Sequence, residues 1–380
     1  MNEYSRLFKP FFDKKEISAV QKVFKKRWIG LGNEVSLFEK EFKNYIGSKN
    51  AIALNSGTAA LHLAIQAFNF PKNKNILVNS LTFSASAMTI VSNNLVPNFV
   101  DCNKDDLGFN IKDAEKKINK NTVAIVLVYY GGHPANLDEI LKFSKKYKIK
   151  LIEDCAHTQG GEYKGKKLGT FGDFGCFSFE EKKGITTGDG GMLVSQNTKL
   201  INKIKPARWV GIDKESWRKK KKLSKAYDHW FYEINLLGHK YNMNDLSAAI
   251  GREQLKKINK FNIKKKFLIK CYLEKIKNIK DIQPILPYNL NNSSYWIFGI
   301  RTKKRDLLIN FLKKNFIATG VHFYPLSLQN FFKKYRGNCP NAHKIWKNIV
   351  SLPLHYSLTV KDINFIASKI AIFFKKLKNS

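Results

Sequence analysis

Between about residues 51 and 195, short apolar segments alternate with stretches whose apolar residues recur at helical spacing. The apolar segments are rich in Ile, Leu and Val, as buried strands are. They are Ala51–Ser56, Asn75–Ser80, Val96–Asp101, Thr122–Tyr130, Lys148–Cys155, Cys176–Glu180 and Gly191–Ser195. Helices are expected at Thr58–Phe68 and Ser84–Asn94. This alternation predicts an α/β domain with a mostly parallel sheet.

The pattern changes after about residue 240. We expect one long helix from Met243 to Ile276, a strand at Ser294–Thr302, and helices at Lys303–Asn315 and Val360–Leu377. The sequence therefore predicts a large domain over residues 1–255 and a smaller C-terminal α/β domain over 256–380. Whether the N-terminal segment packs on the smaller domain stays open.

Charge adds little to this picture. The chain has a formal net charge of +37, from 67 Lys and Arg against 30 Asp and Glu. The basic residues are spread along the chain and are nearly all lysines, which fits AT-rich codon usage better than a nucleic-acid site. The sharpest cluster, Trp217–Lys222, is interpreted as a solvated loop, with an anionic partner as the alternative.

Several other classes of protein are not expected. The five cysteines are isolated and odd in number, and the histidines lack HxxxH or HExxH spacing, so we expect neither a disulfide framework nor a metal. No apolar run is long enough to cross a bilayer, and the N-terminus lacks the layout of a signal peptide. We expect a cytoplasmic protein with no membrane or nucleic-acid partner.

The segment Asn55–Ala64 (NSGTAALHLA) passes from a predicted strand through a Ser-Gly-Thr turn into a helix. Free N–H groups at a helix start attract phosphate, and Gly57 lets the main chain come close. The alternative is an ordinary helix N-cap.

The segment Ile152–Gly160 (IEDCAHTQG) places Asp154 at the carboxyl end of a strand, the edge at which sheet sites open. A carboxylate there could hold a proton on a pyridine nitrogen and make the ring an electron sink. The alternative is an N-cap aspartate.

The segment Phe177–Gly191 (FSFEEKKGITTGDGG) carries lysines between a strand and a Gly-rich turn. A Schiff base needs a lysine that is partly desolvated and free to swing away. In so lysine-rich a chain, only the surrounding motif gives such a lysine weight.

Together these segments resemble the DegT/StrS-type sugar aminotransferases, a branch of the fold-type-I enzymes that use pyridoxal phosphate. The resemblance runs from about Lys9 to Ile370. It includes further matches at Thr82–Val91, Tyr129–Ile140, Gly238–Leu255, His322–Gln329 and Ser351–Thr359.

The resemblance implies a role for each matching residue. Lys183 takes the Schiff-base position, with Lys182 as the alternative, and Asp154 pairs with the pyridine nitrogen. His157 lies near the ring hydroxyl or the substrate, unless it only packs or caps. The other implied cofactor-binding residues are Gly57, Thr58 and Ser178 at the phosphate, Phe83 on the ring face unless it is a core aromatic, and Gln159.

Two departures from the family pattern stand out. Lys240 occupies a place where many relatives have an asparagine that reaches the neighbouring subunit's phosphate, so either Lys240 or Asn242 would make this contact in a homodimer. The lysine motif carries Glu180, Glu181 and Lys182 where relatives often have aromatic, Pro or Thr residues. That change would alter the pocket wall and keep the Schiff-base lysine.

The implied activity is transfer of an amino group from L-glutamate to a nucleotide-linked keto-sugar, with a 4-keto-6-deoxyhexose favoured, as in lipopolysaccharide or O-antigen deoxyamino-sugar synthesis. Lys214, Arg218 or Lys240 could meet the diphosphate. The alternatives are a sugar dehydratase, in which histidine replaces the lysine, and a non-catalytic regulatory or polyanion-binding relative. Lys183 opposes the first, and the intact motifs oppose the second.

Overall fold

The computed structural model describes residues 5–134, 136–213, 228, 230–286, 292–335 and 337–378. The basic cluster Trp217–Lys222, and with it Arg218, lies outside these residues, as does Lys214. Nothing in the structure therefore bears on the interpretation of that cluster.

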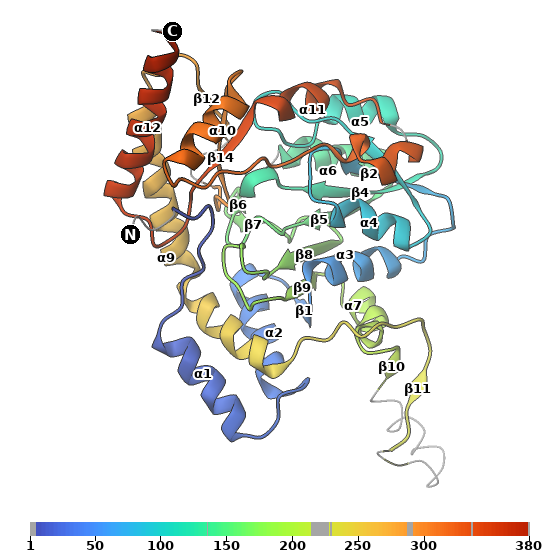
Figure 1. The fold of residues 1–380 in the computed structure, drawn as a ribbon. Coiled ribbons are helices and arrows are strands. Elements are labelled where there is room, and N and C mark those ends of the chain that lie inside the picture. The colour runs from blue at the N-terminus through green and yellow to red at the C-terminus, as the bar shows by residue number, and fades with distance from the viewer. Residues whose placement is uncertain are drawn as a thin grey trace.

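The centre of the molecule is a seven-stranded sheet with the order β1-β9-β8-β5-β4-β2-β3 (Figure 1). Strand β9 is antiparallel to β1 and β8, and the pairs β8–β5, β5–β4, β4–β2 and β2–β3 are parallel. The strands are β1 Asn50–Leu54, β2 Asn75–Asn79, β3 Val96–Val100, β4 Thr122–Val128, β5 Lys150–Asp154, β8 Phe174–Ser178 and β9 Gly191–Ser195. The predicted strands and the mostly parallel sheet are confirmed.

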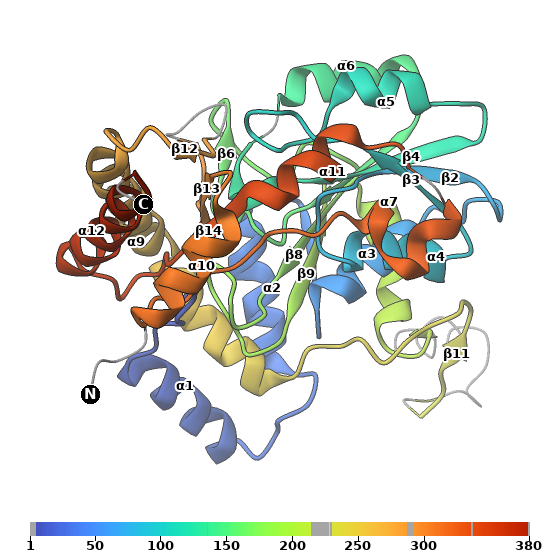
Figure 2. The ribbon, with the colours of Figure 1, turned by 45° about the horizontal axis from the view of Figure 1, so that its top comes forward.

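Helices cover both faces of this sheet and bury a separate apolar core on each (Figures 1 and 2). One core includes residues of α3, α4 and α7, and the other includes residues of α2, α5 and α6. Because both faces are covered, the central strands are apolar on both sides rather than alternating. The helices are α1 Lys14–Lys25, α2 Asn33–Ile46, α3 Gly57–Gln66, α4 Ala85–Ser92, α5 Ile111–Lys117, α6 Leu137–Lys146 and α7 Thr198–Ile204.

A smaller antiparallel sheet, β12-β13-β14, forms a third apolar core with the C-terminal helices. Its elements are β12 Gln283–Pro284, β13 Phe298–Arg301, β14 Ile349–Leu352, α10 Arg305–Lys314 and α12 Val360–Lys378. Helix α11, Pro340–Ile345, instead packs on the large sheet's core. Two short pairs complete the strands: β6 Glu162–Tyr163 with β7 Lys166–Lys167, and β10 Ile212–Asp213 with β11 Glu233–Ile234.

Helix α9, Asp245–Ile276, is continuous across the predicted domain boundary at residue 255. Its first half contributes Ala248 and Leu255 to the core of the large sheet. Its second half contributes Leu268 and Tyr272 to the small core. The helix therefore belongs to both units, and the exact boundary stays a prediction.

The strand predicted at Ser294–Thr302 is shorter than expected, because β13 begins only at Phe298. The N–H groups of Ser294 and Trp296 bind the carbonyls of Gly132 and Gly131, at 3.0 and 2.8 Å, so this segment pairs with a loop of the large domain. Tyr295 between them has a φ of 49°, which interrupts an extended strand. The interruption brings Trp296 to the large domain.

The cysteines are free thiols, and four of the five are buried. Over the residues that the structure describes, no group of three or more His, Cys, Asp or Glu side chains could hold a metal ion. Among the same residues, no helix is both long and apolar enough to span a membrane.

Candidate active site

A cavity of about 340 Å³ opens at the carboxyl ends of β5 and β8. Its wall combines the start of α3, the start of α4 and the loop after β8 with residues from the C-terminal third of the chain. Of the residues predicted for the site, it brings together Gly57, Thr58, Phe83, Asp154, His157, Ser178 and Lys183.

Asp154 is the last residue of β5, and its carboxyl group is buried at the cavity wall. Ser86 donates a hydrogen bond to Oδ2 at 2.7 Å, and the main-chain N–H of Ala156 donates to Oδ1 at 3.1 Å. Burial raises the pKa of Asp154, while these bonds and the charge of Lys183 oppose the rise. A cationic partner in the cavity would therefore be strongly favoured beside Asp154.

The preceding residue, Glu153, points to the other side of the sheet and serves the fold. Its carboxyl group accepts the hydroxyl of Tyr129 and the N–H groups of Gly169, Phe171 and Gly172, all at 2.6 to 2.8 Å. These bonds fix the loop that leads into β8. Of the two carboxylates at the end of this strand, only Asp154 lines the cavity.

Lys183 lies in the loop between β8 and β9, where its N–H binds the carbonyl of Glu180 at 2.9 Å. Its side-chain nitrogen lies 4.5 Å from the centre of the Trp296 ring. Burial lowers the pKa of Lys183, although Glu180 and Asp154 oppose the shift. A lowered pKa increases the fraction of neutral amine, which is the nucleophilic form.

Lys182, the alternative lysine, is exposed, and its ammonium group pairs with Glu180 at 3.5 Å. Its carbonyl accepts the indole N–H of Trp296 at 2.8 Å, so the main chain at this point is anchored. The geometry therefore favours Lys183 as the residue whose amine is desolvated beside Asp154.

The start of α3 forms a cradle suited to a phosphate group. Ser56 caps the helix by accepting the N–H of Ala59 at 3.0 Å, while Gly57 and Thr58 occupy the first turn, where N–H groups lack acceptors within the helix. A Cβ atom on Gly57 would lie 2.7 Å from Cβ of Ser178, so only glycine allows this approach to β8. The three residues predicted at a phosphate are thus neighbours.

Aromatic rings form another part of the cavity wall. The His157 imidazole stacks on the Trp296 indole with ring centres 3.7 Å apart and planes 3° from parallel. Burial lowers the pKa of His157, and its Nδ1 has no hydrogen-bond partner among the described residues. Phe83 lines the cavity and is 59% exposed, so it is not a core aromatic. Its ring is free to stack on a bound ligand.

Three predicted site residues do not line this cavity in the single chain. Gln159 is buried behind it, where its carboxamide binds the carbonyl of Ser178 and the N–H of Gly184 and so joins β8 to the lysine loop. Lys240 and Asn242 lie on a segment beside β1, and the carbonyl of Lys240 accepts the side chain of Asn55 at 3.1 Å. Their contacts with a cofactor stay predictions.

The structure adds residues to which sequence reasoning gave no role. Ser86 orients Asp154, and Trp296, His322 and Phe323 close the cavity from the C-terminal third of the chain. His322 and Phe323 lie in a segment whose family pattern is visible in the sequence. Ser86 also lies in a matched segment, Thr82–Val91, whereas Trp296 does not. Neither was given a role, because a helix and a strand account for their surroundings.

Comparison with known proteins agrees with this geometry. The model of the DegT/DnrJ/EryC1/StrS aminotransferase family matches residues 10–371. The chain belongs to this family. The fold-type-I architecture is confirmed by the Helicobacter pylori aminotransferase PseC, involved in pseudoaminic acid biosynthesis, which has a TM-score of 0.92 and 27% identity over 98% of this chain and 100% of that one.

Several curated relatives match nearly the whole chain, and two of them illustrate the similarity. An uncharacterized protein of Methanocaldococcus jannaschii is 38% identical over 94% of both chains. The UDP-4-amino-4,6-dideoxy-N-acetyl-beta-L-altrosamine transaminase of Campylobacter jejuni is 34% identical over 96% of both. The protein is therefore an aminotransferase related to enzymes of sugar metabolism.

Pyridoxal phosphate is the cofactor of aminotransferases of this family, which confirms the prediction from the sequence. The cavity fits this group. Asp154 is a buried carboxylate suited to a protonated pyridine nitrogen, and Lys183 is a desolvated amine suited to the aldehyde. The cradle at Gly57 suits the phosphate.

Proposed function

We propose that the protein transfers an amino group from L-glutamate to a nucleotide-linked 4-keto-6-deoxyhexose. The observation that carries the proposal is that Lys183, Asp154 and the start of α3 meet at one cavity. The Campylobacter relative supports the choice of carbon, because its name describes a UDP-linked sugar with an amino group at C4 and deoxygenated C6.

The bound cofactor would act as the electron sink for the transfer. Lys183 would hold it in the resting enzyme and, once displaced by a substrate amine, move a proton between the substrate carbon and the cofactor. Asp154 would keep the pyridine nitrogen protonated, and Ser86 would hold the carboxylate in place. The wall formed by His157 and Trp296 would keep water from the reacting atoms.

A nucleotide diphosphate would provide binding energy far from the reacting carbonyl and orient the sugar at Lys183. The predicted contacts of Lys214 and Arg218 with this group lie outside the described residues. Lys240 is exposed, with its ammonium group 5.4 Å from the centre of the Trp209 ring. Of the three basic residues considered for the diphosphate, Lys240 is the one that lies among the described residues.

We also propose a homodimer in which Lys240 or Asn242 reaches the partner's cofactor phosphate. Both residues lie outside the cavity of their own chain, and the carboxamide oxygen of Asn242 is buried without a described partner. Nearby, Trp230, Ile234 and Leu237 are 63 to 74% exposed on the projecting arm that carries β11 (Figure 1). Burial of such side chains against a second copy would stabilise a dimer.

The substrate is tested by incubating the enzyme with L-glutamate, pyridoxal phosphate and a panel of nucleotide-linked 3-keto and 4-keto sugars, with products identified by mass spectrometry and NMR. We expect amination of a 4-keto-6-deoxy sugar. Equal rates with simple α-keto acids would contradict the need for the nucleotide. Reaction of a 3-keto sugar alone would contradict the choice of carbon.

The dimer is tested by mixing two inactive variants, Lys183→Ala and a Lys240→Ala/Asn242→Ala double variant. A hybrid dimer has one site in which both the lysine and the partner's contacts are intact. We expect mixing with exchange of subunits to restore activity. A fully active, cofactor-loaded monomer in sedimentation would refute the proposal.

A further inference from the structure

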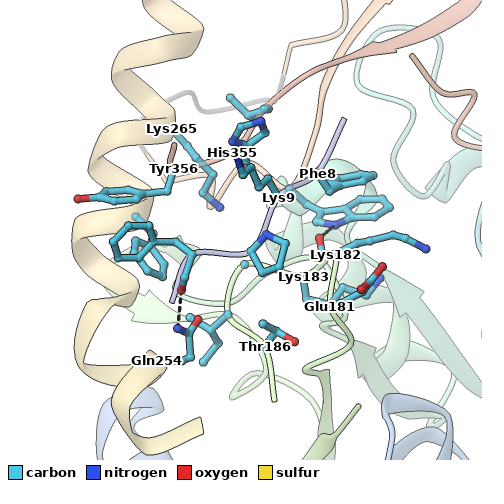
Figure 3. Close-up of a pocket in the computed structure, with 17 residues that line it drawn as sticks. Phe8, Lys9, Glu181, Lys182, Lys183, Thr186, Gln254, Lys265, His355 and Tyr356 are labelled. Atoms are coloured by element: carbon cyan, nitrogen blue, oxygen red, sulfur yellow. Dashed lines mark hydrogen bonds between the residues drawn. The ribbon is translucent and has the colours of Figure 1, made fainter. Parts of the chain in front are cut away.

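Figure 3 shows the residues around a second, much smaller cavity of about 40 Å³. It is enclosed by the N-terminal segment around Phe8, the lysine loop, helix α9 and the segment at His355. Phe8, Lys182, Lys183 and Trp296 line both cavities, so the two spaces meet at the Lys183–Trp296 pair.

The chemistry of the small cavity is cationic. Lys265 of α9 is only 6% exposed, and its ammonium group donates to the carbonyl of Ser294 at 2.8 Å. Within the described part of the chain, Lys265 forms no ion pair. The nearby charge that affects its pKa is that of another lysine, Lys266, which lowers it. A buried ammonium group with a single carbonyl acceptor is costly unless a negative charge joins it.

Two further basic groups face the same space. Figure 3 shows His355 and Lys9 on the side of the cavity where Lys265 enters. Nδ1 of His355 is buried and has no hydrogen-bond partner among the described residues. Burial, with a smaller contribution from the charge of Lys9, lowers the pKa of His355 to about 4. The acidic lining residue, Glu181, is exposed to solvent.

We propose that this small cavity binds a carboxylate group of the amino-acid donor, with Lys265 as its principal partner. The inference rests on the proposed aminotransferase reaction with glutamate. An amino donor must bring its nitrogen to the atom that Lys183 holds, and its carboxylates then lie within a few ångströms of Lys183. The cavity has room for a few water-sized groups, and so for a carboxylate rather than a sugar, since one water needs about 10–15 Å³ of such space.

This assignment separates the two substrates in space. The donor's carboxylate enters the small cavity beside Lys265, and the nucleotide-sugar uses the larger cavity alone. Burial lowers the pKa of Lys265 to about 7, so a bound carboxylate would restore the charged form and donor binding would take up a proton near neutral pH.

The two half-reactions provide the test. In the first, glutamate and the aldehyde form of the cofactor give 2-oxoglutarate and the amine form; in the second, the amine form and the keto-sugar give the amino-sugar and the aldehyde form. Each is followed by cofactor absorbance in single turnover. Lys265→Met should raise the half-saturating glutamate concentration about 10- to 100-fold, the effect of losing a charged hydrogen bond. The half-saturating keto-sugar concentration should not change.

The matched control is Lys264→Met, on the same helix, where the ammonium group lies 5.4 Å from the centre of the Phe267 ring and outside the cavity. It removes the same charge and should leave both half-reactions unchanged. Calorimetry with glutarate, which has two carboxylates and no amine, gives a readout independent of turnover. The holoenzyme should bind glutarate about 10- to 100-fold more tightly than its Lys265→Met variant.

Unchanged affinities for glutamate and glutarate in Lys265→Met would overturn the proposal, and so would equal losses in both half-reactions, which indicate a packing defect. If this variant does not fold, Lys265→Gln and His355→Gln are measured in the same way, and the proposal fails if neither weakens glutarate. If no keto-sugar reacts with the unmodified enzyme while glutamate binding still depends on Lys265, the proposed acceptor is wrong and the donor site stands.

Discussion

Glu153 and Asp154 are consecutive residues of β5 whose carboxyl groups serve opposite sides of the sheet. Glu153 accepts hydrogen bonds from Tyr129 and three main-chain N–H groups, whereas Asp154 faces the cavity and is held by Ser86. Side chains of a strand alternate between its faces, so the neighbours acquire different tasks. Substitutions at the two positions should therefore have separable effects.

Asp154→Asn should leave the fold intact and reduce transamination at least about 100-fold, because a neutral amide cannot stabilise the charged pyridine nitrogen. The buried carboxyl has a raised pKa, so its removal should not destabilise the cofactor-free protein. Single-turnover kinetics and denaturant unfolding check the two effects. A folded, cofactor-loaded variant with most of its activity would exclude the assigned role.

Glu153→Gln should lower the free energy of unfolding by about 1–3 kcal/mol, since a carboxamide cannot accept from all four donors around it. Urea unfolding of the variant measures this difference. The fraction that remains folded should turn over glutamate at nearly the normal rate. A stable but inactive variant would instead place Glu153 in the chemistry.

Lys183 should be the residue that carries the cofactor. Borohydride reduction followed by peptide mapping should find the pyridoxyl mass on Lys183. Lys183→Ala should lose about 10²–10⁴-fold in turnover as the proton-transferring amine is removed. Lys182→Ala is the control, because its side chain is exposed and paired with Glu180. A pyridoxyl mass on Lys182 would reverse the assignment.

Gly57→Ala should weaken cofactor binding, because the added Cβ would lie 2.7 Å from Cβ of Ser178 and push the start of α3 away from β8. Overpacking of this kind costs about 1–3 kcal/mol. Equilibrium titration with pyridoxal phosphate measures the change in affinity. Gly30→Ala, where a Cβ would meet nothing within 4 Å, is the matched control and should bind normally.

The stability of the protein without substrates should rise with pH above about 7 through Lys265. Its folded pKa is lowered to about 7 from 10.5, so between these values the unfolded chain binds one more proton than the folded chain. One such proton contributes about 1.4 kcal/mol per pH unit to the slope. Denaturant unfolding from pH 7 to 9 should show a steeper rise for the unmodified protein than for Lys265→Met. Parallel curves would contradict the lowered pKa.

Much of the fold was predictable because the strands of the large sheet are buried on both faces and read as continuous apolar runs. β9 was predicted to the residue, and β2 and β3 to within one residue. β13 was predicted four residues too early, because Ser294 and Trp296 pair with the loop at Gly131 and Gly132. Periodicity cannot reveal a partner more than 160 residues away along the chain.

The residues of the candidate site likewise fall into two groups, those that a sequence pattern indicates and those that only the three-dimensional contacts reveal. Asp154 and Lys183 were expected at the site because the segments Ile152–Gly160 and Phe177–Gly191 match the family pattern, and the structure places both residues at the cavity. Trp296 and Lys265 lie in none of the matched segments, and Ser86, which lies in one, was given no role. The importance of these three residues comes from contacts with His157, Ser294 and Asp154. In a chain with 67 basic residues, composition cannot show that Lys265 is buried without a carboxylate partner among the described residues.

The unbroken course of α9 has a consequence for how the protein loses its structure. The helix buries Leu255 in one core and Tyr272 in another, and it packs against α1, α2 and α12 (Figure 1). If either core melted alone, half of the helix would lose the tertiary packing that supplies most helical stability. The unfolding of one unit therefore destabilises the other through the shared helix. Heating should produce a single cooperative transition rather than two.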